Sequence, residues 1–111
     1  MKLNCDCKNI EIEVAEPAQV TICNCSICSR YQALWGYYSP EEVRVSVGTL
    51  GLDIYLRGER EIEFVRCGNC GCVTHYRSIP GDSDPIVAVN FRLASFQSNH
   101  IPIRFHNGRA V

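Results

Sequence analysis

The chain has 111 residues, of which 46% are hydrophobic and 21% charged, with a formal net charge of -1 at pH 7. This length suits one domain, because two independent cores would each fall below the usual minimum. The composition excludes a disordered, collagen-like or coiled-coil chain. The near-neutral charge argues against a general nucleic-acid binder. We therefore expect a single domain over residues 1–111.

Apolar residues that alternate with polar ones predict a series of short strands. Ile10, Ile12 and Val14 alternate with two glutamates, which is the period-2 pattern of a half-buried strand. The same signal recurs, between glycine-containing turns, at 43–47, 52–56, 62–64 and 73–77, and 86–91 reads as a buried strand. The tail, 98–111, could be a final strand or a loosely docked end. The predicted fold class is mainly β, with short antiparallel sheets.

Helical signals are confined to two short segments, each of at most one or two turns. Residues 39–42, Ser-Pro-Glu-Glu, have the form of a capping box with proline at the first helical position. The apolar positions that follow return to period 2, so we expect at most one turn there. Residues 26–34 could form the other helix, although they carry no clear amphipathic stripe.

Eight cysteines in so short a chain indicate either a disulfide framework or metal sites. Residues 1–7 show no apolar segment of a signal peptide, and no apolar run approaches the roughly 18 residues of a membrane span. We therefore expect a cytoplasmic protein with no membrane partner. Its thiols would stay reduced and serve metal or redox chemistry.

The cysteines fall into three groups, and two of them suit one closed metal site. In Cys67-Gly-Asn-Cys70-Gly71 the spacing and the glycines are typical of a zinc knuckle, in which backbone N–H groups donate to the thiolates. Cys5 and Cys7, if extended, would present both sulfurs on one face of a strand. Together the four cysteines predict a structural zinc site with four thiolate ligands. The alternative is that either pair is simply buried or disulfide-linked.

The remaining group, Cys23, Cys25 and Cys28, offers three ligands from one short segment. Three protein ligands leave zinc an open position, which distinguishes catalytic from structural zinc. A substrate thiol could fill that position, because zinc with sulfur ligands accepts another sulfur and deprotonates it. Two alternatives remain open: Cys72 or His75 could be a fourth ligand that closes the site, or the three thiols could form a metal-free redox group.

Other polar and aromatic residues are weaker candidates. His75 could transfer a proton or support a metal ligand, or could be an ordinary half-buried strand residue. Arg30 could bind a substrate carboxylate, as could Arg77 and Arg92. His100 and His106, in the polar tail, are most simply surface residues. The aromatic residues at 31, 35, 37 and 38 could wall a pocket, although core packing explains them equally well.

The order C-x-C, C-x-C-x-x-C-x-R, C-x-x-C-G resembles the glutathione-dependent formaldehyde-activating enzyme family, to which centromere protein V is also related. The three motifs stand at residues 5–7, 23–30 and 67–71, and 33–35, 52–55, 70–75 and 89–92 also look like family positions. The resemblance implies a β-tent of stacked sheets clamped by zinc knuckles, with two zinc ions per chain. By position it makes Cys5, Cys7, Cys67 and Cys70 structural ligands, and Cys23, Cys25 and Cys28 catalytic ones.

The resemblance also implies carbon–sulfur lyase chemistry, which in the synthetic direction joins a small thiol such as glutathione to formaldehyde. We therefore expect a lyase in which Cys23, Cys25 and Cys28 hold the catalytic ion, Arg30 binds a substrate carboxylate and His75 assists proton transfer. The alternative is a non-catalytic module with two structural zinc sites that binds a partner protein. The sequence leaves the oligomeric state open, a homo-oligomer included.

Overall fold

The computed structural model describes residues 1–57, 62–94 and 100–109. Strands account for most of its regular structure, with one short α-helix and two 3₁₀ turns. The first half contains β1 (Lys2–Asn4), β2 (Ile10–Glu13), β3 (Val20–Cys23), α1 (Ser26–Tyr31), β4 (Trp35–Tyr38), η1 (Pro40–Glu42) and β5 (Arg44–Val47). The second half contains β6 (Leu52–Leu56), β7 (Ile62–Cys67), β8 (Val73–Ser78), β9 (Val87–Asn90), η2 (Phe91–Ala94) and β10 (Ile103–His106). The mainly β class is confirmed.

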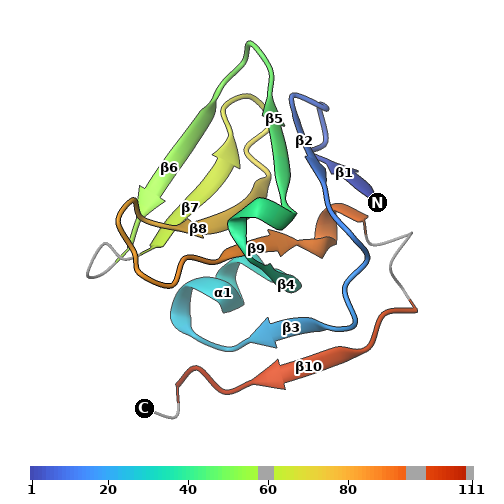
Figure 1. The fold of residues 1–111 in the computed structure, drawn as a ribbon, viewed down its shortest axis with the longest axis vertical. Coiled ribbons are helices and arrows are strands. Elements are labelled where there is room, and N and C mark those ends of the chain that lie inside the picture. The colour runs from blue at the N-terminus through green and yellow to red at the C-terminus, as the bar shows by residue number, and fades with distance from the viewer. Residues whose placement is uncertain (58–61, 95–99, 110–111) are drawn as a thin grey trace.

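The strands form two sheets that lean together as the sides of a tent (Figure 1). One sheet has the order β1-β2-β5, and the other has the order β10-β3-β4-β9-β8-β7-β6. In Figure 1 the β6–β8 hairpins form one slope and β5 with β2 the other, while β3 and β10 lie along the base. Pairing is antiparallel except between β3 and β10, which run parallel.

The expected strands from 10 to 91 are present within a few residues of their predicted ends. The structure adds β1, which has only three residues, and β3 and β4, whose sequences Val-Thr-Ile-Cys and Trp-Gly-Tyr-Tyr contain no charged residue to mark an exposed face. The capping box forms as predicted, since the Ser39 backbone N–H donates to Glu42 Oε1 at 2.8 Å, and it opens one 3₁₀ turn. No helix among the described residues is long and apolar enough to span a membrane.

The core has two parts that lie on opposite faces of the large sheet. One fills the space between the sheets and includes Ile10, Ile12, Val89 and Phe91. The other is built on Trp35, with Ala33, Phe64, Tyr76, Ala88 and Cys28. Its rings are in contact, the Trp35 and Tyr76 centroids being 4.8 Å apart in an edge-on arrangement. This aromatic cluster forms the floor beneath one of the cysteine groups.

Gly36 on β4 is required by close packing between the core and the large sheet. A Cβ atom at this position would lie 2.5 Å from Cε2 of Phe91, whose side chain is fully buried. Gly36→Ala should therefore lower the free energy of unfolding by about 1–3 kcal/mol, the usual cost of overpacking. Urea denaturation followed by tryptophan fluorescence measures this.

A double variant checks the cause of that loss. Phe91→Leu alone should also destabilise, because it leaves a cavity. Combined with Gly36→Ala, it should cost less than the sum of the two single changes, because the leucine leaves room for the new methyl group. Simple additivity would show that the cost of Gly36→Ala does not arise at Phe91.

Candidate metal centres and the adjoining cavity

The first thiol group lies at the ridge of the tent, where loops from both slopes meet. Its members are Cys5, Cys7, Cys67 and Cys70, whose sulfur atoms all lie within 4.8 Å of one another. Sγ of Cys7 is 3.8 Å from that of Cys5 and 3.6 Å from that of Cys67. Sulfurs about 3.8 Å apart are what a tetrahedral zinc site with Zn–S bonds of about 2.3 Å requires. The four residues can therefore hold one metal ion as a closed set.

Backbone N–H groups are aimed at these sulfurs. The N–H of Asn69 donates to Cys67 Sγ at 3.3 Å, and that of Ile10 donates to Cys5 Sγ at 3.3 Å. Burial opposes ionisation of Cys67, but the N–H groups of Cys70 and Asn69 outweigh it and lower its pKa to about 6. Burial raises the pKa of Cys5 to about 11. The knuckle thus favours a thiolate before any metal is bound, as its spacing and glycines predict.

One expectation about this group is wrong. Residues 5–7 are not extended but form a turn between β1 and β2, closed by the Lys8 N–H donating to the Cys5 carbonyl at 3.0 Å. Lys8 has a φ of 68°, in the left-handed region. The two sulfurs come together because the backbone turns at residues 5–8. The prediction assumed an extended strand, in which alternate side chains share a face, and did not consider a turn.

The second thiol group lies where β3 passes into α1. Sγ atoms of Cys23, Cys25 and Cys28 lie within 4.8 Å of one another, from the last residue of β3, the N-cap of α1 and its third residue. In the described part of the chain no fourth histidine, cysteine or acidic side chain joins this set. None of the eight cysteines forms a disulfide. Three soft ligands from one turn can hold a metal ion and leave one coordination position to solvent.

Hydrogen bonds orient each of these three sulfurs. Cys23 Sγ accepts from the Cys25 N–H at 3.5 Å, Cys25 Sγ from the Cys28 N–H at 3.4 Å, and Cys28 Sγ from Trp35 Nε1 at 3.4 Å. For Cys25, burial opposes ionisation but the donors outweigh it and lower the pKa. Burial raises the pKa of the Cys28 thiol to about 12. Trp35, fully buried, therefore acts as a support for a ligand as well as a core residue.

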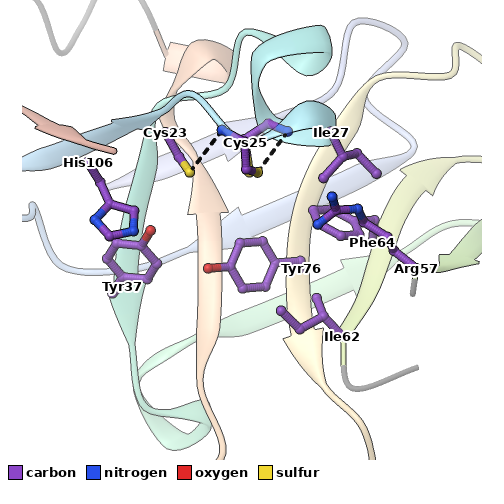
Figure 2. A pocket seen from close by; sticks show the side chains of 10 residues that line it. Cys23, Cys25, Ile27, Tyr37, Arg57, Ile62, Phe64, Tyr76 and His106 are labelled. Atoms are coloured by element: carbon purple, nitrogen blue, oxygen red, sulfur yellow. Dashed lines mark hydrogen bonds between the residues drawn. The ribbon is translucent and has the colours of Figure 1, made fainter. Parts of the chain in front are cut away.

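A cavity of about 370 Å³ opens beside this group, which is within the usual size of a small-molecule site. Figure 2 shows Tyr76 at its centre, with Tyr37 and His106 on one side and Ile27, Phe64 and Arg57 on the other. Burial raises the pKa of Tyr37 and of Tyr76, so both phenols keep their protons and can donate hydrogen bonds. The aromatic residue at 37 thus walls a pocket, whereas Trp35 lies beneath it.

The C-terminal strand closes one side of the site, which the sequence did not predict. His106 on β10 is the register partner of Cys23 and lines the cavity. Beyond it, Asn24 Nδ2 donates to Asn107 Oδ1 at 2.9 Å, and Arg109 Nε donates to the Asn24 carbonyl at 2.6 Å. A Cβ at Gly108 would lie 2.8 Å from Cys23 Sγ. Within the tail, β10 is therefore a strand, and residues 106–109 lie against the second thiol group.

His75 does not line the cavity. Its neighbour Tyr76 does, and successive residues of a strand face opposite sides of the sheet. The His75 ring is 1% exposed, pairs in register with Val65 and Val89, and has Nδ1 2.8 Å from Thr74 Oγ1. Burial, with a smaller contribution from Arg77, lowers its pKa to about 4. The structure does not bring His75 to the second thiol group, either as a ligand or as a proton donor.

Burial of neutral His75 makes stability depend on pH. An unfolded histidine titrates near 6.5, so between pH 6.5 and 4 the unfolded chain binds a proton that the folded chain excludes. Stability is retained above pH 6.5 and falls by about 3 kcal/mol on reaching pH 4. In His75→Gln this contribution should be missing. Urea denaturation gives the unfolding free energies of the unaltered chain and of His75→Gln. The difference between them should change by about 3 kcal/mol from pH 7 to pH 4, and a difference that stays constant would contradict the role of His75.

Arg30 and Cys72 also lie outside the cavity. Arg30 Nη1 donates to the Ser26 carbonyl at 2.7 Å and lines a neighbouring hollow with Tyr55 and Arg57. Cys72 lies beside the first thiol group, where it interacts with Cys70 and with the backbone N–H of Asp6. The Asp6 N–H favours the thiolate, but burial and Cys70 outweigh it and raise the pKa of Cys72. Of the other arginines considered, Arg77 pairs with Glu63 at 2.9 Å and Arg92 donates to the Gln32 carbonyl at 2.7 Å.

Fold and site together define a β-tent domain with a four-thiol and a three-thiol metal-ligand group, the second beside an aromatic cavity. The family model for the glutathione-dependent formaldehyde-activating enzyme matches residues 1–102, so the chain belongs to that family. A crystal structure of a Rhodobacter sphaeroides protein, a structural-genomics target, is similar over 96% of this chain and 100% of its own, with 26% identity and a TM-score of 0.77. No curated protein sequence matches the chain.

Proposed function

We propose that this chain is a zinc-dependent carbon–sulfur lyase, working in either direction on the adduct of a small thiol and an aldehyde. S-Hydroxymethylglutathione, formed from glutathione and formaldehyde, is the type of adduct that the family name suggests. Both thiol groups would hold zinc, the first as a structural ion and the second as the catalytic one. Eight free thiols suit a reducing compartment, so we place the protein in the cytoplasm.

The observation that carries this proposal is the unequal number of ligands in the two groups. Four sulfurs at the ridge would complete a tetrahedral set on an ion, while three sulfurs at α1, which line an aromatic cavity, would leave one position open. Zinc bound by three thiolates supplies a Lewis acid that lowers the pKa of a thiol taking its open position. A second structural site would have no use for an open position or for a cavity.

Around that position, residues of the chain orient the three cysteine sulfurs and offer hydrogen-bond donors to the substrate. Indole Nε1 of Trp35 fixes Cys28, and the N–H groups of Cys25 and Cys28 fix the other two sulfurs. The protonated phenols of Tyr37 and Tyr76 interact with each other and face the cavity, where the hydroxyl that does not donate to its neighbour can donate to an aldehyde oxygen. Such donors stabilise the negative charge that this oxygen gains in the transition state.

In the synthetic direction, the thiol gives its proton to water, the sulfur lone pair forms the carbon–sulfur bond, and the carbonyl π electrons move to oxygen, which takes up a proton from water. In the lyase direction, the hydroxyl gives its proton to water, the carbonyl re-forms and the carbon–sulfur bond breaks to release the thiolate, which regains a proton from water. No oxidant or reductant is consumed. Tyr76 in the floor and Tyr37, 44% exposed at the rim, offer the hydrogen-bond donors for the oxygen in both directions.

The test is whether the protein catalyses the formation of thiol–formaldehyde adducts. Exchange NMR measures the rate with labelled formaldehyde and a panel of small thiols, among them glutathione, which gives S-hydroxymethylglutathione. The zinc-loaded protein should speed the exchange above the uncatalysed rate for at least one thiol. Metal analysis should give two zinc ions per chain. Exchange that stays at the uncatalysed rate with every thiol would favour the alternative, a zinc module that binds a partner protein.

A further inference from the structure

We propose that Arg57 makes the cavity selective for thiols that carry a carboxylate, and that this group lies in the hollow between Arg57 and Arg30. The inference rests on the proposed function, because it assumes that a thiol enters the open position beside Cys23, Cys25 and Cys28. It adds a specificity-determining residue, one that the cysteine motifs do not include.

Arg57 stands on the boundary between two spaces. It follows β6 directly and lines both the 370 Å³ cavity and a second hollow of about 330 Å³, as does Ile27. Its Nη2 donates to the Ser26 hydroxyl at 2.7 Å, and Ser26 is the residue next to Cys25. In Figure 2 the guanidinium lies between Ile27 and Phe64, across Tyr76 from His106. A ligand with its sulfur at the thiol group therefore shares the cavity with Arg57.

Charge is the second part of the inference. Among the described residues, no acidic side chain lines either space, and neither Arg57 nor Arg30 has a carboxylate partner. Three thiolates around a divalent ion carry a net charge of -1, and an incoming thiolate adds another. A second negative group on the ligand would be repelled from this site unless a cation compensated it. Arg57 is placed to do so.

Arg30 completes the hollow. Its Nη1 donates to the Ser26 carbonyl, and Nη2 of Arg57 donates to the Ser26 hydroxyl. The two guanidinium groups, one from α1 and one from the residue after β6, therefore meet at Ser26. The bond to Ser26 fixes each guanidinium and uses only part of its N–H donors. The planar fork that remains suits a carboxylate. Tyr55 forms the other side of the hollow.

The experiment uses cobalt-substituted protein and two thiols of the same carbon backbone, only one of which carries a negative charge away from the sulfur, 3-mercaptopropionate and its methyl ester. Binding to the open position is read from the visible spectrum of the ion. In the unaltered chain the carboxylate should bind about fivefold more tightly than the ester, as befits an exposed guanidinium. Arg57→Gln should abolish this preference with the affinity for the ester unchanged, and Arg30→Gln should reduce it. Arg44→Gln, on exposed β5, is the control for loss of one positive charge and should keep it.

The outcomes distinguish failure of the carboxylate selectivity from failure of the proposed function, which requires the open position. Equal binding of the two thiols, or a preference that survives Arg57→Gln, would overturn the selectivity and leave the open position intact. A spectrum that no thiol perturbs would overturn the open position, and with it the entry of any thiol ligand. A preference lost equally in Arg44→Gln would assign the effect to net charge and overturn the role of Arg57.

Discussion

Replacing Cys70 by serine should unfold the domain. Cys70 is one of four thiols that lie together where the β1–β2 turn meets the β7–β8 knuckle, so an ion held by them would tie together the two slopes of the tent. A structural zinc ion contributes on the order of 10 kcal/mol in small domains, which is comparable with the whole stability of such a protein. The Cys70→Ser chain should therefore lose its near-ultraviolet circular dichroism and its cooperative thermal transition.

Cys72 provides the matched control for that result. It lies two residues further along, beside Cys70, but is not one of the four thiols. Cys72→Ser should keep the fold and the metal content, with a loss of about 1 kcal/mol from its half-buried position. If both serine variants unfold alike, the loss comes from disturbed packing at the knuckle and not from the missing ligand.

The sequence predicts most of this fold because its signals are local. Alternation marks β2, β5, β6 and β7 correctly, and the knuckle spacing anticipates the N–H donors to Cys67. These patterns require only a few neighbouring residues and a rule about which way side chains point. The division of seven thiols into four and three follows for the same reason, since each group is built from one or two short motifs.

Much of what the sequence did not predict depends on contacts between distant segments. His106 and Gly108 reach the second thiol group only because β10 pairs in parallel with β3, some eighty residues away in the chain. Arg57 lies next to that group through its side-chain bond to Ser26. Neither contact can be read from one segment, because a single strand does not encode its partner. His75 is a different case: the alternation of β8 puts it on the opposite face from Tyr76, but which of the two faces meets the cavity depends on the packing of the whole sheet.

Replacing Cys25 by serine should abolish the proposed lyase activity and keep the fold. Cys25 is the N-cap of a six-residue helix at the edge of the cavity, and a serine oxygen can accept the Cys28 N–H in its place. The hydroxyl is a poor ligand for zinc beside two thiolates, so the second ion should be lost. We expect thiol-adduct exchange to fall by at least about a hundredfold, as expected when a metal-ion contribution of several kcal/mol is removed.

Two measurements on Cys25→Ser connect that loss to the second ion. Metal analysis should give one zinc ion per chain in place of two, and the thermal transition should remain cooperative. Tyr37→Phe, at the rim of the same cavity, should keep both ions and lower the exchange rate less, because it removes one donor and no ligand. If Cys25→Ser unfolds as completely as Cys70→Ser, both ions are structural, because only a structural site couples its metal so strongly to folding.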